Sequence, residues 1–293
     1  MIRAIISLIR PQQWAKNVFV LLPLFFGGQL FNGWCWHQAI VTFFAFSFIA
    51  SSVYCINDLK DIEADRKHPK KCLRPLASGR LKPYQGVIIS SILVALSLTM
   101  CFLWLGRQAL QVALLIASYF VINMAYCFKL KRYAIIDVFI LSLGFVIRLF
   151  AGGVSCNVWL SPWIVLMTFL LALFLAFAKR RDDVLIYESN NVIVRENIVR
   201  YNRSFLNLTL SIIATITIVC YIMYTVSPQV ISNFHTEYVY VTSIFVLIAI
   251  LRYLQVTIVD GKSGSPTKIL LEDRFIQSCI GLWILSFIII LYV

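Results

Sequence analysis

Long runs of apolar residues alternate with short polar segments along almost the whole chain. Many of the runs approach the roughly 20 residues that a helix needs to cross a bilayer. The pattern predicts an all-α integral membrane protein, a single domain over residues 1–293. We expect nine membrane-spanning helices, at Val18–Phe31, Ala39–Ile56, Tyr84–Leu105, Ala109–Phe128, Ala134–Gly153, Pro162–Ala178, Phe205–Val226, Tyr238–Val259 and Phe275–Val293.

Composition agrees with this pattern and excludes a soluble protein. Of the 293 residues, 60% are hydrophobic and 13% are charged, and the mean hydropathy is +0.85. In a soluble protein, the net charge of +13 would suggest a nucleic-acid partner. Here the basic residues gather in alternate loops, as they do where loop charge fixes membrane orientation. We therefore expect a lipid bilayer as partner and no nucleic acid.

The loop charges also predict which end lies in the cytoplasm. One side of the membrane collects Arg10, the loop after the second span, Lys129–Arg132 and Lys179–Arg181, whereas the other side has Arg107 and little else. Cytoplasmic loops are the ones enriched in lysine and arginine. We therefore place the N-terminus in the cytoplasm, and an odd number of spans puts Val293 outside.

The N-terminal segment and the cysteines exclude other possibilities. Residues Met1–Arg10 lack a small-residue cleavage site, so a short interfacial helix is favoured over a signal peptide. None of the eight cysteines has CxxC spacing, which argues against a zinc site and against a disulfide framework. Cys35 and Cys156 fall on the predicted outer side, and the sequence leaves open whether they meet.

A polar stretch begins at Asn57, where the second apolar run ends. On a helix, Asn57, Asp61 and Asp65 stack at intervals of four residues, with Asp58 beside them. Carboxylate and amide oxygens are the ligands that Mg²⁺ prefers, and it often shares them with substrate phosphates. The alternative is a solvated acidic helix end. Ionisable clusters at the end of a membrane helix are costly, so we favour a functional site.

Basic residues follow the acidic ones at once: Arg66, Lys67, Lys71 and Arg74. A metal site beside a cationic loop suits a polyanion such as a diphosphate. The alternative is an ordinary positively charged cytoplasmic loop. The basic residues alone would not distinguish a binding site from such a loop.

Further polar residues lie at the same predicted side. Lys16 and Asn17 belong to the segment Arg10–Asn17, which precedes the first span and could bind phosphate. Taken alone, this segment favours an interfacial anchor instead. Asp137 and Arg148 are 11 residues apart in the fifth span and share a helix face. An arginine this deep requires an anion, a water-filled cavity or a carboxylate on a neighbouring helix.

The charged segment Lys179–Asp183 ends the sixth predicted span. It is either a stop-transfer cluster or a second wall of the site, with bases for phosphates and an aspartate for the metal. The loop expected from Val184 to Ser204 could cap the mouth. The late Gly-Lys-Ser-Gly-Ser segment is not a phosphate-binding Walker loop, because it lacks the first glycine and the strand before it.

The motif Asn57-Asp58-x-x-Asp61-x-x-x-Asp65, at the predicted cytoplasmic end of the second helix, resembles the first aspartate-rich motif of the UbiA superfamily of intramembrane prenyltransferases. Within the superfamily, four segments are similar to the decaprenyl-phosphate phosphoribosyltransferase branch: Pro11–Asn17, Asp61–Gly79, Lys179–Arg181 and Asp273–Arg274. The resemblance covers nearly the whole chain in topology.

The resemblance implies a nine-helix UbiA-like bundle in a bacterial inner membrane. The implied reaction is Mg²⁺-dependent transfer of 5-phosphoribose from phosphoribosyl pyrophosphate to a polyprenyl phosphate of decaprenyl type, for cell-envelope glycolipid synthesis. Asp58, Asp61 and Asp65 would hold the metal, and Asn57 would orient a ligand. The candidate substrate-binding residues are Lys16, Asn17, Arg66, Lys67, Lys71, Arg74, Tyr126, Arg148, Lys179, Arg180, Arg181 and Asp183. A homo-oligomer stays open.

One departure from the superfamily bears on the reaction. Its prenyltransferases carry a second motif, Asp-x-x-x-Asp, whereas here Ile186 follows Asp182 and Tyr187 follows Asp183 at that spacing. This weighs against the nearest alternative, a prenyltransferase that moves a polyprenyl group from its diphosphate to an aromatic acceptor. A transporter with a cytoplasmic cation site fits least, because the polar residues crowd one face instead of mid-membrane.

Overall fold

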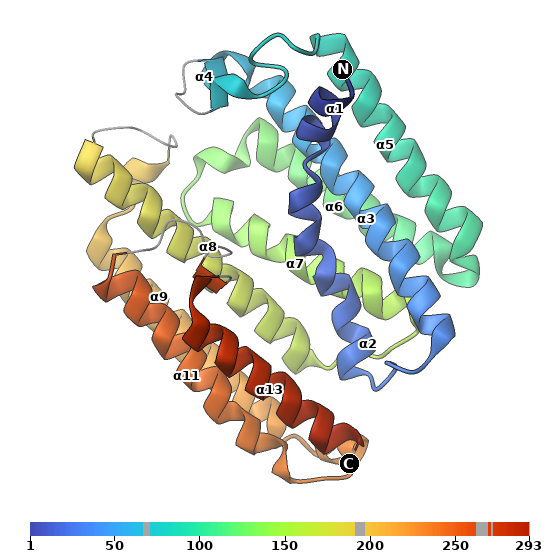
Figure 1. Cartoon of the computed structure of the whole chain (residues 1–293), viewed down its shortest axis with the longest axis vertical. Coiled ribbons are helices and arrows are strands. Elements are labelled where there is room, and N and C mark those ends of the chain that lie inside the picture. The colour runs from blue at the N-terminus through green and yellow to red at the C-terminus, as the bar shows by residue number, and fades with distance from the viewer. Residues whose placement is uncertain (67–70, 191–196, 262–268, 271, 293) are drawn as a thin grey trace. The chain divides into compact units, whose positions relative to one another are not determined.

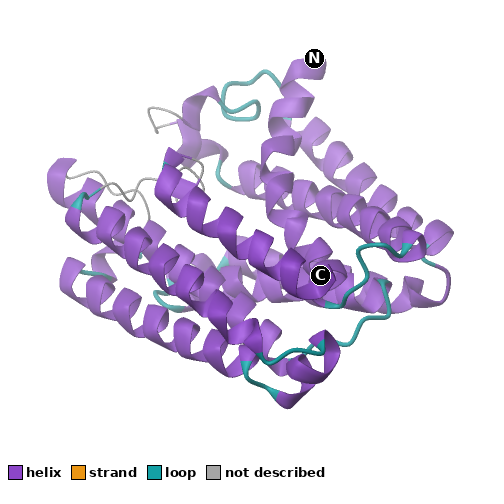
Figure 2. Cartoon of the chain, turned by 60° about the horizontal axis from the view of Figure 1, so that its bottom comes forward, coloured by secondary structure: helices purple, strands orange, loops and turns teal. Residues whose placement is uncertain are grey.

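The structure is a computed structural model, and it describes all residues except 67–70, 191–196, 262–268, 271 and 293. The described residues form helices and loops without a strand (Figure 2). Seven helical segments among them are long and apolar enough to cross a membrane. The prediction of an all-α membrane protein is confirmed, whereas the count of nine spans and the cytoplasmic N-terminus stay predictions.

The chain divides into two compact units, and the first comprises residues 1–131 and 143–160. It contains the latter part of α7 (Ile136–Ser155) and the complete helices α1 (Ile2–Ile9), α2 (Leu22–Phe26), α3 (Gly33–Lys60), α4 (Ile62–Arg66), α5 (Pro83–Trp104) and α6 (Ala109–Phe128). Short 3₁₀ helices at Pro11–Leu21, Lys71–Leu73 and Gly106–Gln108 connect them.

Local sequence explains where the two longest helices of this unit begin. The Asn32 side chain accepts the N–H groups of Trp34 and Cys35 and so caps α3. Pro83 occupies the first turn of α5, where no N–H is needed. The two helices lie side by side (Figure 1), and the Ser52 and Ser90 hydroxyls meet across them at 2.7 Å. Small side chains at this contact allow close helix packing.

The first predicted span, Val18–Phe31, has a different structure. The chain forms a 3₁₀ helix over Pro11–Leu21 and then the short α2. A Cβ atom on Gly152 of α7 would lie 2.0 Å from the Val20 carbonyl oxygen, so this backbone passes directly against the glycine. The rings of Phe19 and Phe145 meet nearby, with centroids 4.9 Å apart. Protein packing of this kind permits irregular backbone at membrane depth.

The structure answers whether Cys35 and Cys156 meet. The Cys156 thiol donates to the Cys35 carbonyl oxygen at 3.4 Å, and the Cys35 thiol lies 3.7 Å from the Cys156 carbonyl oxygen. Both are free thiols. They join the start of α3 to the end of α7 within the first unit.

The second unit comprises residues 132–142 and 161–293. It contains the first part of α7 together with α8 (Pro162–Asn190), α9 (Arg203–Thr225), α10 (Pro228–Phe234), α11 (Ser243–Leu254) and α13 (Arg274–Tyr292). Shorter 3₁₀ helices lie at Ile198–Arg200 and Tyr238–Thr242, and a π-helical turn follows α11 at Gln255–Val259. Asn202 caps α9 through the Phe205 N–H, and the Asp273 carboxylate accepts the Ile276 N–H at the start of α13.

Helix α8 continues well beyond the span end predicted at Ala178. It runs through the charged segment to Asn190, so the first part of the loop expected from Val184 is helical. The reason is that the charges after Ala178 have partners inside the protein. Arg180, for example, pairs with Asp137 and with Asp183 one turn further on.

Candidate functional site

The acidic motif straddles a break between two helices. Helix α3 ends at Lys60, and Asp61 adopts a non-helical backbone conformation before α4 begins at Ile62. The prediction of one continuous helix is therefore wrong at this point. The interval of four residues persists, because the Asp61 N–H bonds to the Asn57 carbonyl and the Asp65 N–H bonds to the Asp61 carbonyl. The residues of the motif thus stay close together, although they lie partly at the end of α3 and partly in α4.

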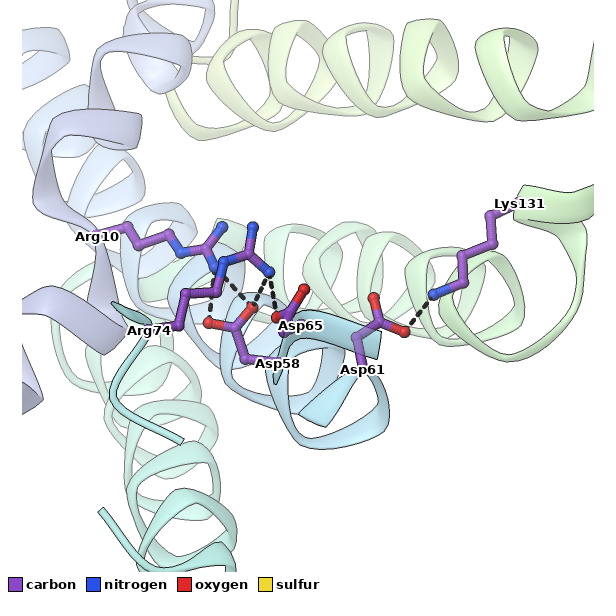
Figure 3. Close-up of polar contacts among 6 residues, drawn as sticks. All are labelled: Arg10, Asp58, Asp61, Asp65, Arg74 and Lys131. Carbon is purple, nitrogen blue, oxygen red and sulfur yellow. Dashed lines mark hydrogen bonds and ion pairs between the residues drawn. The ribbon is translucent and has the colours of Figure 1, made fainter. Parts of the chain in front are cut away.

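Asp58 is buried between two arginines. Its side chain is only 2% exposed. One terminal nitrogen of Arg10 lies 2.6 Å from each carboxylate oxygen, and Arg74 donates to the Oδ1 atom at 3.0 Å (Figure 3). Arg10 also lies over the Tyr54 ring, 5.2 Å from its centroid. A buried carboxylate requires such charged partners.

Arg74 links Asp58 to Asp65. The same Nη1 atom that contacts Asp58 also donates to Asp65 Oδ2 at 2.6 Å (Figure 3). Asp65 is buried, whereas the Arg74 side chain is 25% exposed. The guanidinium therefore joins a carboxylate of α3 to a carboxylate of α4 near the surface of the unit.

The third carboxylate of the motif has a separate partner. Asp61 accepts from the Lys131 ammonium at 2.7 Å, and Figure 3 shows its side chain turned toward that lysine. Lys131 follows α6 along the chain. All three aspartates of the motif (Asp58, Asp61 and Asp65, here the aspartate cluster) are thus paired with basic side chains.

The donor chemistry of the aspartate cluster fits Mg²⁺, since its side chains offer oxygen atoms alone. Among the described residues, no group of three histidine, cysteine or acidic side chains is positioned to hold a metal ion. The carboxylates are instead paired with basic side chains: Arg74 joins Asp58 to Asp65, and Lys131 pairs with Asp61. A metal ion would require the cluster to exchange some of these partners.

A second cationic group of the first unit surrounds Arg148. This arginine is 5% exposed, and it donates to the Asn17 side chain at 2.7 Å, the Gly144 carbonyl at 2.7 Å and the Tyr119 hydroxyl at 3.0 Å. The rings of Phe46, Tyr119 and Phe145 lie around its guanidinium. Within the described part of the chain, Arg148 is thus surrounded by neutral oxygens and aromatic faces.

Lys16 lies within the electrostatic influence of this group. It is an exposed residue of the 3₁₀ helix Pro11–Leu21. Protein atoms packed around its ammonium, followed by the positive charges of Arg148 and Arg10, lower its pKa to about 8. A lysine held near other cations is suited to an anionic ligand, which would relieve the repulsion between them.

The second unit holds its own buried ionic cluster. Arg180 is fully buried, with Asp137 at 2.7 Å and Asp183 at 2.9 Å. The Tyr201 hydroxyl donates to Asp137 at 3.0 Å. Arg181 is also buried and donates to the Asn207 side chain and to the Thr257 carbonyl. Asp137 therefore pairs with Arg180, although the sequence grouped it with Arg148.

The remaining predicted site residues lie in varied surroundings. Arg66 donates to the Ala77 carbonyl at 3.1 Å, which ties α4 to the following loop. Lys71, Tyr126 and Asn57 are half-buried, and Lys179 is exposed. Lys67 lies outside the described residues.

Sequence reasoning did not pair Arg10 and Lys131 with the acidic motif, nor Tyr119 with Arg148. Arg10 is 48 residues from Asp58, and Lys131 is 70 residues from Asp61. Contacts of such long range leave no local spacing pattern. The available signal was their predicted place on the same side of the membrane as the acidic motif.

Comparison with known proteins identifies relatives over nearly the whole chain. Residues 18–278 match the UbiA prenyltransferase family. Decaprenyl-phosphate phosphoribosyltransferase of Mycolicibacterium smegmatis is 35% identical over 97% of this chain and 91% of its own length. The protein of that name from Mycobacterium tuberculosis is 32% identical over 97% of this chain and 93% of its own.

Solved structures show the same fold. A UbiA homologue from Archaeoglobus fulgidus, bound to GPP and Mg²⁺, superposes with a TM-score of 0.70 over 99% of this chain and 100% of its own, at 18% sequence identity. The family match, the full-length relatives and the shared fold agree. The chain belongs to the UbiA prenyltransferase family.

Proposed function

We propose that this protein transfers 5-phosphoribose from phosphoribosyl pyrophosphate to a polyprenyl phosphate, releasing pyrophosphate. The observation that carries the proposal is the similarity to proteins named decaprenyl-phosphate phosphoribosyltransferase over almost the full length of both chains. The cation-rich surroundings of the aspartate cluster support it, because both substrates carry phosphate groups.

The aspartate cluster is the proposed binding site for the metal and the pyrophosphate. Asp58, Asp61 and Asp65 would hold Mg²⁺, with Asn57 orienting a ligand. Bound there, Mg²⁺ would offset the negative charge of the leaving pyrophosphate. Arg74 and Lys71 lie on the loop that follows α4, and we assign them to the phosphate oxygens.

The lipid phosphate is assigned to the cationic group around Arg148. Arg148 is held by Asn17 and Tyr119, so its charge is fixed in direction, whereas Lys16 is exposed and can reach a headgroup. A phosphate monoester is already an anion, so its attack on the anomeric carbon needs no general base. The role proposed for these residues is to position the nucleophile.

The other candidates from the sequence receive narrower proposals. Arg66 would fix the loop through Ala77, and Tyr126 would line the site beside the acidic motif. Arg180, Arg181 and Asp183 would hold α8 in place through their buried contacts, and the exposed Lys179 would meet phosphate. Lys67 stays a candidate for pyrophosphate binding. A bacterial inner membrane is the proposed location.

The test uses the purified protein in detergent with Mg²⁺, a polyprenyl phosphate and phosphoribosyl pyrophosphate labelled in the ribose. Label should enter the lipid fraction with the wild type and be lost with Asp61→Ala. Glu63→Ala, which removes an exposed carboxylate two residues away, should retain transfer. Chelation of Mg²⁺ should also abolish it.

A second arm of the test decides against the nearest alternative. If the labelled lipid never forms, but a polyprenyl group moves to an aromatic acceptor from its diphosphate, the phosphoribosyl proposal fails and the prenyltransferase activity stands. If Glu63→Ala and Asp61→Ala lose transfer equally, the role of Asp61 in the site is wrong.

A further inference from the structure

The ion pairs that Asp58 and Asp65 make with Arg74 compete with metal binding at the same carboxylates. Both carboxylates are nearly fully buried, at 2% and 3% exposure, and one nitrogen of Arg74 contacts both. Two buried carboxylates so close together repel each other unless a cation lies between them. In this structure that cation is a guanidinium.

We propose that Arg74 is an exchangeable counter-ion of the site: it neutralises Asp58 and Asp65 at rest, and it transfers its guanidinium to the diphosphate when Mg²⁺ binds the carboxylates. The proposal rests on the proposed function in that the diphosphate is taken to be that of phosphoribosyl pyrophosphate. It adds a coupling between metal and diphosphate binding that the assignment of ligands alone does not contain.

The surroundings of Arg74 suit such an exchange. Its backbone is fixed in a turn, because its N–H bonds to the Lys71 carbonyl and its carbonyl accepts the Ser78 N–H. Its side chain is 25% exposed, so the guanidinium can leave the carboxylates without unfolding the loop. Arginine is also the side chain best matched to phosphate oxygens.

Arg10 differs from Arg74 in ways that leave it in place. Both of its short contacts go to the single carboxylate of Asp58, and its guanidinium also lies over the Tyr54 ring. It does not contact Asp65 in the described structure. Arg10 can therefore remain on Asp58 while Arg74 moves.

The exchange makes binding of the two ligands mutually dependent. Mg²⁺ alone must displace Arg74 and leave its charge without an anion. Diphosphate alone can attract Arg74 only by stripping a cation from two buried carboxylates, which is costly. Together the two ligands satisfy all the charges. Such coupling is reciprocal, so each ligand should raise the affinity for the other by the same factor.

The test is a calorimetric titration of the full-length protein in detergent, first with MgCl₂ alone and then with inorganic pyrophosphate at saturating Mg²⁺. Arg74→Gln should bind Mg²⁺ about tenfold more tightly than wild type, because the competing cation is gone. The same variant should bind pyrophosphate about tenfold more weakly, because a phosphate ligand is gone. The two shifts in opposite directions are the signature of the exchange.

Arg80→Gln is the matched control. Arg80 lies on the same loop and carries the same charge, but it bonds to Ser78 and to the Leu73 carbonyl instead of the aspartate cluster. Both affinities should stay within about twofold of wild type. Should Arg74→Gln fail to fold, Arg74→Lys provides the test. An ammonium is more strongly hydrated than a guanidinium and pairs less well with buried carboxylates, so Mg²⁺ affinity should again rise.

Two results would overturn the proposal. If Arg74→Gln weakens pyrophosphate binding without raising Mg²⁺ affinity, Arg74 is a phosphate ligand only. If both affinities fall, its role is structural. Failure of the labelled-lipid assay with the opposite shifts intact would instead reject the phosphoribosyl reaction and keep the exchange for another diphosphate substrate.

Discussion

Two basic residues of this protein show how surroundings decide what a charge can do. Arg180 is fully buried and pairs with two aspartates, so its charge is already committed to the fold. Lys16 is an exposed residue, and its pKa is lowered first by protein atoms around its ammonium and then by the nearby cations Arg148 and Arg10. A buried, paired charge such as that of Arg180 stabilises the fold, whereas a charge such as that of Lys16 is itself stabilised by a bound anion.

Replacing Arg180 with methionine should therefore destabilise the protein strongly. The substitution keeps much of the side-chain volume but leaves Asp137 and Asp183 buried without their shared cation, a loss of about 3–5 kcal/mol. The measurement is the thermal unfolding midpoint in detergent. Arg107→Met, at an exposed arginine, should leave it nearly unchanged. Equal midpoints for the two variants would show that the buried pairs contribute little.

The lowered pKa of Lys16 predicts a pH dependence of lipid-phosphate binding. Below pH 8 its ammonium is charged and attracts the phosphate; above about pH 8 the charge is lost and the KM for polyprenyl phosphate should rise. Lys16→Arg keeps its charge throughout this range, so its KM should not rise there. The measurement is KM between about pH 6.5 and about pH 9.5, which covers roughly 1.5 pH units on each side of the lowered pKa. An identical rise in both proteins would assign the titration to another group.

At the scale of elements, the contact between the 3₁₀ helix Pro11–Leu21 and α7 depends on a missing side chain. A Cβ on Gly152 would meet the Val20 carbonyl oxygen at a distance that no structure tolerates. This contact fixes the segment that carries Lys16 and Asn17 against the helix that carries Arg148. The geometry of the cationic group is thus set by a glycine four residues from Arg148.

Gly152→Ala should separate these two elements. Overpacking of a close contact costs about 1–3 kcal/mol or more, and here the obstacle is backbone that cannot rotate away. We expect a lower unfolding midpoint and a raised KM for polyprenyl phosphate. Gly281→Ala in α13 is the control, because an added Cβ there meets no atom within 4 Å. A tolerated Gly152→Ala would mean that the elements can shift apart at little cost.

The sequence was sufficient for features with local patterns and insufficient for those made by distant contacts. Apolar run length predicted most helices, and the spacing of Asp58, Asp61 and Asp65 identified the acidic motif. The partners Arg10 and Lys131 are far away in sequence, so no spacing rule could supply them. The extension of α8 past Ala178 was not predicted, because a run of charges is typical of the end of a span. The partner that buries Arg180 is Asp137, which is distant in sequence.

For the whole molecule, the remaining prediction is its orientation in the membrane. From the positive loops we expect the N-terminus and the acidic motif to lie in the cytoplasm. Alkaline phosphatase fused after Val293 should be active, because that end is expected outside, and the same reporter fused after Lys131 should be inactive. Activity at Lys131 and none at Val293 would invert the orientation, and activity at neither would contradict an odd number of spans.

The bridge that Arg74 makes between two buried carboxylates also has a consequence for inhibitor chemistry. A compound that copies only the negative charge of a diphosphate would draw Arg74 away and leave Asp58 and Asp65 without the cation between them. A compound that carries its own cation beside the anionic group would satisfy both halves at once. Zwitterionic scaffolds should therefore outperform purely acidic ones, even where the acidic compound copies the natural substrate more closely.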